Sequence, residues 1–548
     1  MKLLRGCRWS LVLSLALLPS LLHGQEPASE TPESPASLEG AVEAVKAAAE
    51  AVVDEAVNSA GEPAAEEPAA EQPAAEPDAD AAIEAAVVKL NVTSRAPDFF
   101  RPWTKASPAK SSGSGVVIAG PRILTNAHVV LHASEVLVQL RQGGDQLRGK
   151  VTAIAPGIDL ALVELVDPAG LGGITPLSLA TDLPKLKSHI SVYGYPQGGD
   201  DLSVTDGIVS RIEYASYNYG AWGTRVQVDA ALNPGNSGGP AIQDGKIAGL
   251  VFSKIQEADN IGYLIPPEEI ESFLKDAADG QYDGNPQMYD EYQTAENEAL
   301  RTFLKMPSEV TGIVVTEPYR DADDYPLEPW DVITHIGPHA IDNQGYVEVR
   351  EGLRLRFQYY IPRLANDGKV ELTVFRDGKS QVVQVPVSPD RDYLVPILKD
   401  RYPEYFIYGP MVFEAASQEY VRGLGANGSG MLLWLNSPIL ERLYDPPAEP
   451  GEELVVIATR LFPHTIAKGY DNRLGVVKSV NGVAVKNLRH LGELLRDSTD
   501  EFLRFEMDDR NESLVFRRSE IEAATEEILT DEGIRYQASE KLRDIWED

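Results

Sequence analysis

Between Val87 and about Asp276 the sequence is a dense series of short apolar segments separated by turns such as Asp244-Gly245. Closely spaced strands with glycine-rich turns are typical of β-barrels rather than of βαβ units. We therefore expect a mostly β fold here, closed by a helix at Pro267–Lys275. The expected strands are Val87–Val92, Gly115–Ala119, Arg122–Thr125, Glu135–Gln139, Leu160–Leu165, His189–Val192, Thr205–Ile212, Arg225–Asp229 and Ile247–Val251.

Two smaller units follow, at about 280–389 and 390–548. The segments Val332–Asp342 and Val476–Val485 share a pattern of strand, turn and short strand, so we expect two divergent copies of one small α+β module. Their expected strands are Thr311–Thr316, Asp331–Ile336, a hairpin of Gly368–Arg376 with Gln381–Pro386, Leu454–Thr459 and Leu474–Val480. A helix is expected at Leu488–Arg496.

The first 86 residues differ in character from the rest. A basic start, a leucine-rich run and small residues predict a secretory signal over 1–24, with an uncleaved signal anchor as the alternative. Residues 25–86 consist mostly of Ala, Glu and Pro and carry a charge of −15, from 16 acidic residues against Lys46. Such a segment buries too little apolar surface to order itself, so we expect a disordered acidic arm. A short amphipathic helix around Val42–Ala56 is a weaker alternative.

Charge and cysteine content exclude several classes of protein. With 49 Lys and Arg against 84 Asp and Glu, the net charge of −35 argues against a nucleic-acid binder, which needs a basic face. The single cysteine, Cys7, lies in the expected signal. A chain without that signal has no disulfide, no cysteine-ligated metal and no cysteine nucleophile. No nucleotide or metal signature is visible, so no cofactor is expected.

Three short stretches carry the candidate chemistry. They are Thr125–Val130, Gly157–Leu162 and Asn233–Pro240, and they contain His128, Asp159 and Ser237 in that order. A serine hydroxyl needs a base to take its proton. A histidine accepts that proton near neutral pH and returns it to the leaving amine. Asp159 precedes an apolar strand, where a shielded carboxylate would orient the imidazole. The three stretches together therefore predict a serine hydrolase triad.

Glycines surround the candidate nucleophile. They allow the tight backbone geometry that points N–H groups at one spot, so we expect the amides of Gly235 and Ser237 to form an oxyanion hole. The run Gly235–Gly239 also fits the nucleophile elbow of α/β-hydrolases, but the acid and histidine would then have to follow the serine. The run Gly144–Lys150 fits most of a phosphate loop but lacks its final Ser or Thr, so we expect a hairpin there.

At these residues the chain resembles the HtrA/Deg family of serine proteases. The segments that carry the resemblance are TNAHVV, DLALVEL, GYPQGGDDLSVTDGIVS, VDAALNPGNSGGPAI and IGYLIP. Further on, YPEYFIYGPMVFEAAS, LVVIATRLFPHTIAKGYDN and VVKSVNGVAVKNLRHL are similar to the tandem PDZ region of plant-type Deg proteases. The resemblance implies a chymotrypsin-like double β-barrel at 87–279, a PDZ domain at 280–389 and a divergent PDZ-like domain at 390–548.

The resemblance also implies ATP-independent cleavage of unfolded proteins by a trimer or a larger homo-oligomer such as a hexamer. In trypsin-like folds the residue six positions before the nucleophile lies at the base of the primary specificity pocket. Here that residue is Ala231 rather than an acid, so cleavage after Lys or Arg is not expected. Together with Leu232, Leu250 and Phe252 it would form a substrate pocket for small or medium aliphatic side chains. The aromatic residues Phe99, Phe100 and Trp103 would staple subunits, with ordinary core packing as the alternative.

Three functions remain open at this point. The first is an exported protein-quality-control endoprotease, periplasmic or extracellular, or membrane-tethered if the signal is retained. The second is a peptide-binding holdase in which proteolysis is minor. The third is a processing protease with one dedicated substrate. Replacing Ser237 by Ala separates the first two, because binding survives that change and cleavage does not.

Overall fold

The structure is a computed structural model that describes residues 79–546, apart from 141–143, 255–261, 321–323, 471–474 and 509–512. The expected signal over 1–24 and most of the expected arm lie outside the described residues. Within the described part of the chain, no helix is long and apolar enough to cross a bilayer.

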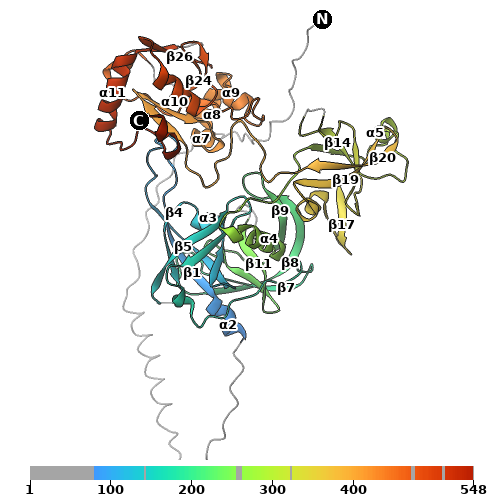
Figure 1. The fold of residues 1–548 in the computed structure, drawn as a ribbon. Helices are drawn as coiled ribbons and strands as arrows, with labels where there is room; N and C mark the ends of the chain where they lie inside the picture. The colour runs from blue at the N-terminus through green and yellow to red at the C-terminus, as the bar shows by residue number, and fades with distance from the viewer. Residues whose placement is uncertain are drawn as a thin grey trace, which may run out of the picture. The chain divides into compact units, whose positions relative to one another are not determined.

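Two closed six-stranded barrels follow one another along the chain (Figure 1). The first has the strand order β1-β2-β3-β6-β5-β4 and the second β10-β11-β12-β9-β8-β7. The strands of the first are β1 (Val87–Ser94), β2 (Ala109–Ile118), β3 (Arg122–Thr125), β4 (Ala133–Gln139), β5 (Gln146–Ala155) and β6 (Leu160–Leu165). Those of the second are β7 (His189–Gly194), β8 (Ser203–Ser216), β9 (Trp222–Val228), β10 (Pro240–Gln243), β11 (Lys246–Lys254) and β12 (Gly262–Ile265). The predicted double β-barrel is confirmed.

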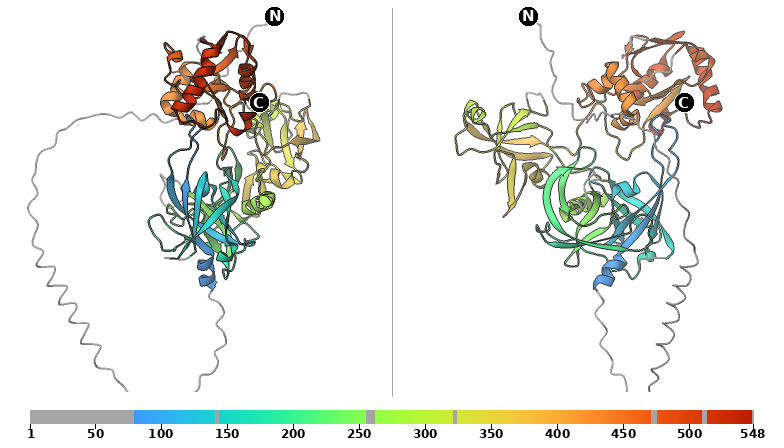
Figure 2. Two further views of the ribbon diagram at one scale, coloured as in Figure 1. Left: turned by 60° about the vertical axis from the view of Figure 1, so that its left-hand side comes forward. Right: turned by 180° about the vertical axis from the view of Figure 1, so that it is seen from behind.

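Apolar residues on the inner faces of the strands hold each barrel closed. In β6 every residue except Glu164 is buried, as expected for a strand covered on both faces. A separate cluster that includes Val192, Val226 and Leu264 fills the second barrel. Helix α4 (Pro267–Asp276) lies against β11 (Figure 2). Its buried residues Ile270 and Phe273 belong to the same apolar cluster as Leu250 of β11. The predicted helix Pro267–Lys275 is therefore confirmed.

The folded part begins earlier than the sequence pattern predicts. Residues Ala79–Ala86, expected as the end of the disordered arm, form helix α2. Ile83 and Ala86 of this helix are buried and join the core of the first barrel, so the helix has an apolar face to bury despite its alanine-rich composition. The expected boundary at residue 87 is wrong by these eight residues.

Two mixed units follow the barrels. The first contains a sheet in the order β13-β14-β15-β19-β20, with β16 beside β15, and a separate pair of β17 and β18. Its elements are β13 (Glu291–Thr294), α5 (Glu298–Phe303), β14 (Ile313–Glu317), β15 (Val332–Ile336), β16 (His339–Ala340), β17 (Tyr346–Arg350), β18 (Leu353–Arg356), α6 (Ile361–Leu364), β19 (Lys369–Arg376) and β20 (Lys379–Pro386).

The second mixed unit has the strand order β21-β22-β23-β24-β26-β27, with β25 beside β24. Its strands are β21 (Tyr405–Tyr408), β22 (Met411–Ala415), β23 (Val455–Ile457), β24 (Gly475–Val480), β25 (Val483–Ala484), β26 (Phe502–Met507) and β27 (Ser513–Arg517). Its helices are α7 (Gln418–Gly423), α8 (Gly425–Trp434), α9 (Pro438–Glu441), α10 (Leu488–Asp497) and α11 (Arg518–Asp531).

The expected similarity between these two units is visible in one local feature. In each unit a strand makes a tight turn into a two-residue strand, β15 into β16 and β24 into β25. The turn in the second unit has positive φ at Asn481 and Gly482, of 48° and 81°. Such angles suit the sequence Asn-Gly, which is common in tight turns between paired strands.

The aromatic residues between β1 and β2 have partners within the chain. Phe99, Phe100 and Trp103 pack against the apolar core of residues 394–534. The ring centroids of Phe100 and Tyr420 lie 5.9 Å apart, and those of Trp103 and Phe462 lie 5.6 Å apart. The core-packing alternative for these three residues is therefore observed.

Candidate active site

His128 lies on the short helix α3 (Ala127–Val130), which directly follows β3 in the first barrel. Its ring nitrogen Nδ1 lies 2.7 Å from Oδ2 of Asp159, and its backbone N–H donates to Oδ1 of the same carboxylate at 2.9 Å. With a proton on Nδ1, the other ring nitrogen keeps a lone pair that can accept a proton. The imidazole remains accessible, since 47% of the His128 side chain is exposed.

Asp159 occupies the turn that leads into β6. Its φ of 58° lies in the left-handed region, which an aspartate tolerates better than most residues. The carboxylate is almost completely buried, with 2% of the residue exposed, as its position before an apolar strand predicted. The side chain of Asn126, between β3 and α3, fixes this turn by donating to the carbonyl of Asp159 at 2.9 Å.

The environment of His128 favours the charged imidazole. Burial lowers the pKa of His128, but the hydrogen bond to Asp159 and the negative charge of that carboxylate together raise it above its usual 6.5. A raised pKa makes the imidazole a stronger base. It also stabilises the imidazolium that forms when a proton is accepted.

Ser237 lies in the loop between β9 and β10 of the second barrel. The Ser237 carbonyl accepts a hydrogen bond from the backbone of Ser114 on β2, at 2.8 Å. A Cβ atom placed on Gly113 would lie 2.8 Å from Val129, the neighbour of His128, and 3.4 Å from the carbonyl oxygen of Ser237. The two barrels thus bring the histidine segment and the serine segment against one glycine.

No hydrogen bond joins the His128 ring to Ser237 among the residues that the structure describes. In unliganded sites of this type that contact is often long and tightens only with substrate bound.

The peptide group before Gly235, whose φ is 102°, is fixed by one backbone contact. The carbonyl of Pro234 accepts from the amide of Gln197 at 2.7 Å. In a trans peptide the N–H points opposite to the C=O, so the amide of Gly235 points away from Gln197. Within the described part of the chain, neither this amide nor that of Ser237 donates an internal hydrogen bond. Both remain free for an external acceptor.

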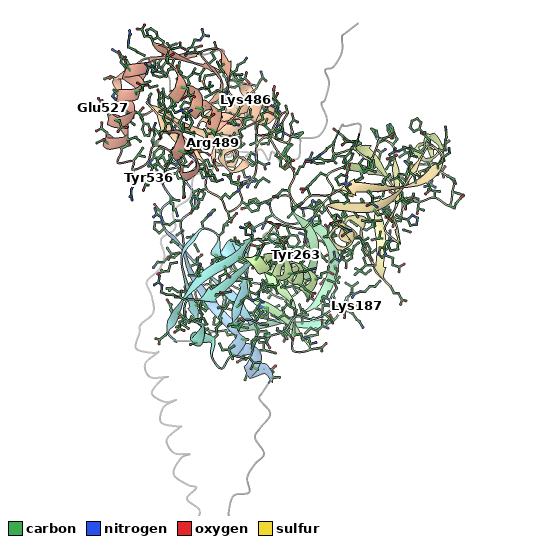
Figure 3. All side chains as sticks on the ribbon, in the orientation of Figure 1. Lys187, Tyr263, Lys486, Arg489, Glu527 and Tyr536 are labelled. Carbon is green, nitrogen blue, oxygen red and sulfur yellow. The ribbon has the colours of Figure 1, made fainter. Side chains whose placement is uncertain are left out.

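The expected pocket residues have different environments. Ala231 is exposed, and Leu232 is 8% exposed and packs over Gly262. Phe252 is half-buried and lies between Tyr217 and Tyr263, with ring centroids 5.0 and 6.2 Å away; Tyr263 is labelled in Figure 3. Leu250 has no exposed surface and belongs to the core, so it does not line a pocket. The assignment of Leu250 to the substrate pocket is therefore wrong. In β11, Leu250 pairs with residues of both β10 and β12, which enclose it.

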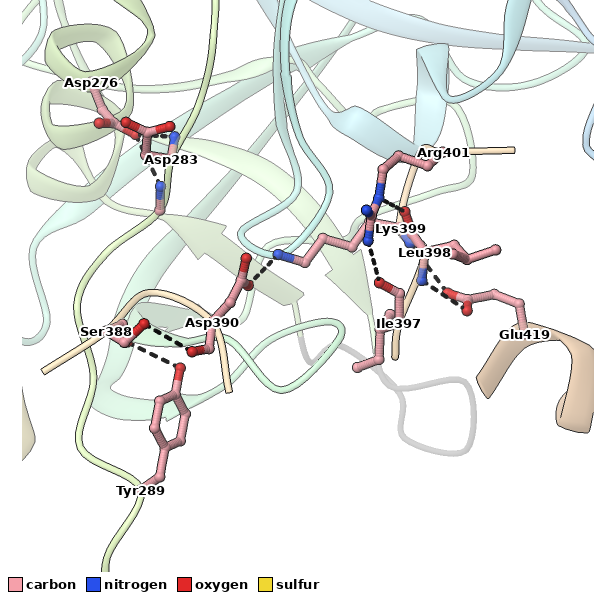
Figure 4. Close-up of polar contacts among 11 residues, drawn as sticks. Asp276, Asp283, Tyr289, Ser388, Asp390, Ile397, Leu398, Lys399, Arg401 and Glu419 are labelled. Carbon is pink, nitrogen blue, oxygen red and sulfur yellow. Dashed lines mark hydrogen bonds and ion pairs between the residues drawn. The ribbon is translucent and has the colours of Figure 1, made fainter. Parts of the chain in front are cut away.

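A cavity of about 830 Å³ lies elsewhere, lined by residues that include 156–158, 219–222, 280–285 and 389–393. Contacts within the chain satisfy many polar groups around it (Figure 4). Lys399 contacts Asp390 at 2.6 Å, and Asp276 accepts from the amide of Asp283 at 2.8 Å. None of the three predicted catalytic residues lines this cavity, although Ile158 immediately precedes Asp159.

The structure adds residues that the sequence motifs did not single out. Asn126 holds the turn of Asp159, and Gln197 holds the peptide before Gly235. Ser114 contacts the serine loop from the other barrel. A possible signal for Ser114 was the run Ser111–Gly115, in which small polar residues begin a strand that is otherwise apolar.

Two family models match parts of the chain. A trypsin-like peptidase domain matches residues 113–250, and a PDZ domain matches residues 396–541. Protease Do-like 4, mitochondrial, from Arabidopsis thaliana is 37% identical over 439 residues, which cover 78% of this chain and 80% of that protein. Protease Do-like 2, chloroplastic, from the same plant is 35% identical over 478 residues, covering 85% and 76%. A solved structure of the HtrA-type protease AlgW with a tripeptide is 25% identical and covers 57% of this chain and 98% of its own, with a TM-score of 0.45.

Proposed function

Because the chain belongs to the HtrA/Deg family of serine proteases and is a serine endopeptidase, we propose that His128, Asp159 and Ser237 are its catalytic triad. The observation that carries the proposal is the pair of contacts from Asp159 to the ring and the backbone of His128. These contacts orient the imidazole, and the order of the three residues in the chain matches that of a chymotrypsin-like triad.

In the proposed reaction the Ser237 hydroxyl attacks the carbonyl carbon of the scissile peptide bond. His128 takes the hydroxyl proton, and a tetrahedral intermediate with a negatively charged oxygen forms. His128 then gives the proton to the leaving amine, the C–N bond breaks, and an acyl-enzyme remains on Ser237. A water molecule attacks this ester with His128 as base again, which releases the acid and restores the serine.

The amides of Gly235 and Ser237 are the proposed donors to the negatively charged oxygen. Both lack an internal acceptor within the described part of the chain, and the contact between Pro234 and Gln197 supports the orientation of the first. Donors fixed before the reaction need no reorganisation when the charge develops, and one such donor typically contributes a factor of about 10²–10³ to the rate.

We propose unfolded proteins as substrates, cleaved without ATP after small or medium aliphatic residues. Ala231 places no charge where the primary pocket of a trypsin-like protease binds its substrate. The buried Leu232 and the half-buried Phe252 would make the remaining wall apolar. A cationic side chain would lose its hydration there without gaining a partner.

Assembly and location complete the proposal. The family resemblance supports a homo-oligomer, a trimer or a hexamer, which analytical ultracentrifugation would measure directly. Export guided by residues 1–24 stays a prediction from the sequence. Two relatives carry the words mitochondrial and chloroplastic in their names, so an organelle is the competing destination. Fractionation of cells that express the full chain distinguishes these locations.

The test is incubation of the purified chain with casein in the absence of ATP, with the Ser237→Ala variant alongside. Cleavage by the parent and none by the variant, with fragment ends after aliphatic residues by mass spectrometry, supports the proposal. Equal cleavage by both would overturn the triad, and cleavage mainly after Lys or Arg would overturn the pocket. Binding of casein by both without cleavage would favour the holdase alternative.

A further inference from the structure

Ser114 is a fully buried residue of β2 with four polar contacts, three of them with the active-site segments. Its backbone N–H donates to the carbonyl of Ser237 at 2.8 Å. Its own carbonyl accepts from Oγ1 of Thr125 at 2.7 Å. Its hydroxyl donates to the carbonyl of Gly235 at 2.8 Å and accepts from the amide of Tyr195 at 2.8 Å. One side chain of the first barrel thus joins two separate segments of the second.

The Ser114 hydroxyl binds the peptide group that follows Gly235, and the amide of Gln197 binds the peptide group that precedes it. The contact with Ser114 fixes the carbonyl of Gly235, and the contact with Gln197 fixes the carbonyl of Pro234. Both ends of a glycine with unusual backbone freedom are therefore held. The Gly235 amide lies in the preceding peptide plane. The following plane, held by Ser114 and by the Asn236 amide, which donates to the carbonyl of Asn233 at 3.0 Å, limits the rotation of the backbone at the Cα of Gly235.

Space around this contact is restricted. A Cβ atom on Gly194 would lie 3.1 Å from the hydroxyl oxygen of Ser114, and one on Gly238 would lie 2.1 Å from the Ser114 carbonyl oxygen. Two backbone segments of the second barrel approach Ser114 too closely for side chains at these two glycines. Removal of the hydroxyl would therefore leave a buried carbonyl and a buried N–H without partners.

We propose that Ser114 is a positioning residue for the oxyanion hole, which sets the Gly235 amide through the carbonyl of the same residue. This inference rests on the proposed function of Gly235 and Ser237. Without the hydroxyl, the Gly235 carbonyl loses its donor, and the peptide plane after Gly235 is held only by the contact between the Asn236 amide and Asn233. The Gly235 amide is then fixed less firmly toward the developing charge. Since that amide contacts the substrate oxygen strongly only in the transition state, the loss falls on kcat rather than on KM.

The test compares Ser114→Ala with the matched control Ser191→Ala. Ser191 lies on β7 of the same domain, and its hydroxyl donates to Asp206 at 2.6 Å rather than to the serine loop. For a peptide substrate we expect Ser114→Ala to lower kcat by roughly 10–10²-fold, less than the loss of a donor itself. KM should change less than about twofold, since substrate contacts remain. The control should keep both values.

Two further readouts separate positioning from general damage. A peptidyl boronic acid, whose adduct places an oxygen in the oxyanion hole, should lose affinity for Ser114→Ala by about the same factor as kcat. The acid limb of the pH profile should not move, because the contact between Asp159 and His128 is untouched. A fluorophosphonate that labels Ser237 measures the folded, reactive fraction, and kcat is referred to that fraction.

A second variant guards against misfolding. Thr125→Val keeps the shape of a fully buried side chain but removes the hydroxyl that holds the Ser114 carbonyl, so a smaller fall in kcat at constant KM is expected. The inference would be overturned if Ser114→Ala had the full kcat of the parent, referred to the fraction that the fluorophosphonate labels. A fall in KM and kcat together would overturn it as well. If Ser237→Ala were active, the proposed function itself would fail, which distinguishes the two outcomes.

Discussion

Asp159 holds His128 at two points, the backbone N–H at 2.9 Å and the ring nitrogen Nδ1 at 2.7 Å. The two oxygens of one carboxylate therefore fix both the position of the histidine and the rotation of its ring. Because only 2% of Asp159 is exposed, water cannot readily take over either contact. The arrangement makes separate predictions about rate and about pH.

Replacing Asp159 by Asn should lower kcat by about 10⁴-fold with little change in KM, because an amide favours the wrong tautomer of the imidazole. The measurement is steady-state cleavage of a peptide by the two proteins. The control is Asp206→Asn, since that carboxylate accepts from Ser191 and is far less buried than Asp159. A loss below tenfold would contradict the role given to Asp159.

The pH profile should report the raised pKa of His128. Burial lowers this pKa, and the hydrogen bond and charge of Asp159 raise it above 6.5 overall. Activity should therefore increase with pH through a midpoint above 6.5, because only the neutral imidazole accepts the serine proton. In Asp159→Asn the remaining effect of burial should move the midpoint of kcat/KM below that of the parent. An unchanged midpoint would mean that another group controls the acid limb.

Replacing Gly235 by Ala should lower kcat by at least about 10²-fold, the loss typical of one oxyanion donor. A Cβ atom there would lie 2.4 Å from the carbonyl oxygen of Tyr195, and φ is 102°. The matched control is Gly245→Ala, at φ 71° with nothing within 4 Å. That variant should lose about 1–2 kcal/mol of folding free energy from the backbone strain and keep its kcat. Equal kcat values for the two variants would rule out the role of Gly235.

Glu269 on α4 predicts a pH dependence of stability. Burial and the neighbouring charge of Glu268 raise the pKa of Glu269 to about 7, although the amide of Thr224 donates to its carboxylate. Between its unfolded pKa of 4.5 and its folded value, the native state binds a proton that the unfolded state lacks. The free energy of unfolding therefore falls as pH rises through this window, by up to about 3 kcal/mol.

In Glu269→Gln this contribution disappears, so the difference in unfolding free energy between parent and variant should change between pH 4.5 and 7.5. Urea unfolding at both pH values measures it. The control is Glu271→Gln, an exposed residue of the same helix, whose difference from the parent should stay constant. A constant difference for Glu269→Gln as well would show that its carboxyl titrates normally.

The sequence predicted the barrel strands well where a short apolar run between polar turns is also buried in the fold. The segments Arg122–Thr125 and Leu160–Leu165 are strands with the expected bounds, because each is a short apolar run between polar turns. The strand β10 (Pro240–Gln243) was missed, since it begins with proline directly after a glycine-rich loop. Helix α2 was missed because its alanines resemble those of the preceding arm, and only contact with the first barrel makes it stable.

In the candidate active site, too, the residues in local motifs were predicted and those that depend on distant contacts were not. His128 and Asp159 were paired from their motifs, and the contact between them is present. Ser114 was not identified, because its partners at Gly235 and Tyr195 lie 121 and 81 residues away and no local pattern encodes them. Leu250 was misplaced for a similar reason. An alternating pattern indicates which residues share a face of a strand, but not which strands cover that face.

His128 and Asp159 belong to one barrel and Ser237 to the other, with the segment 166–188 between β6 and β7 joining them. A cut in that segment divides the proposed chemistry as well as the chain: one fragment keeps the proposed base and its orienting acid, and the other keeps the proposed nucleophile. Neither fragment by itself can hydrolyse a peptide through the proposed triad. Co-expression of the two fragments would turn proteolysis into a direct signal of their reassembly.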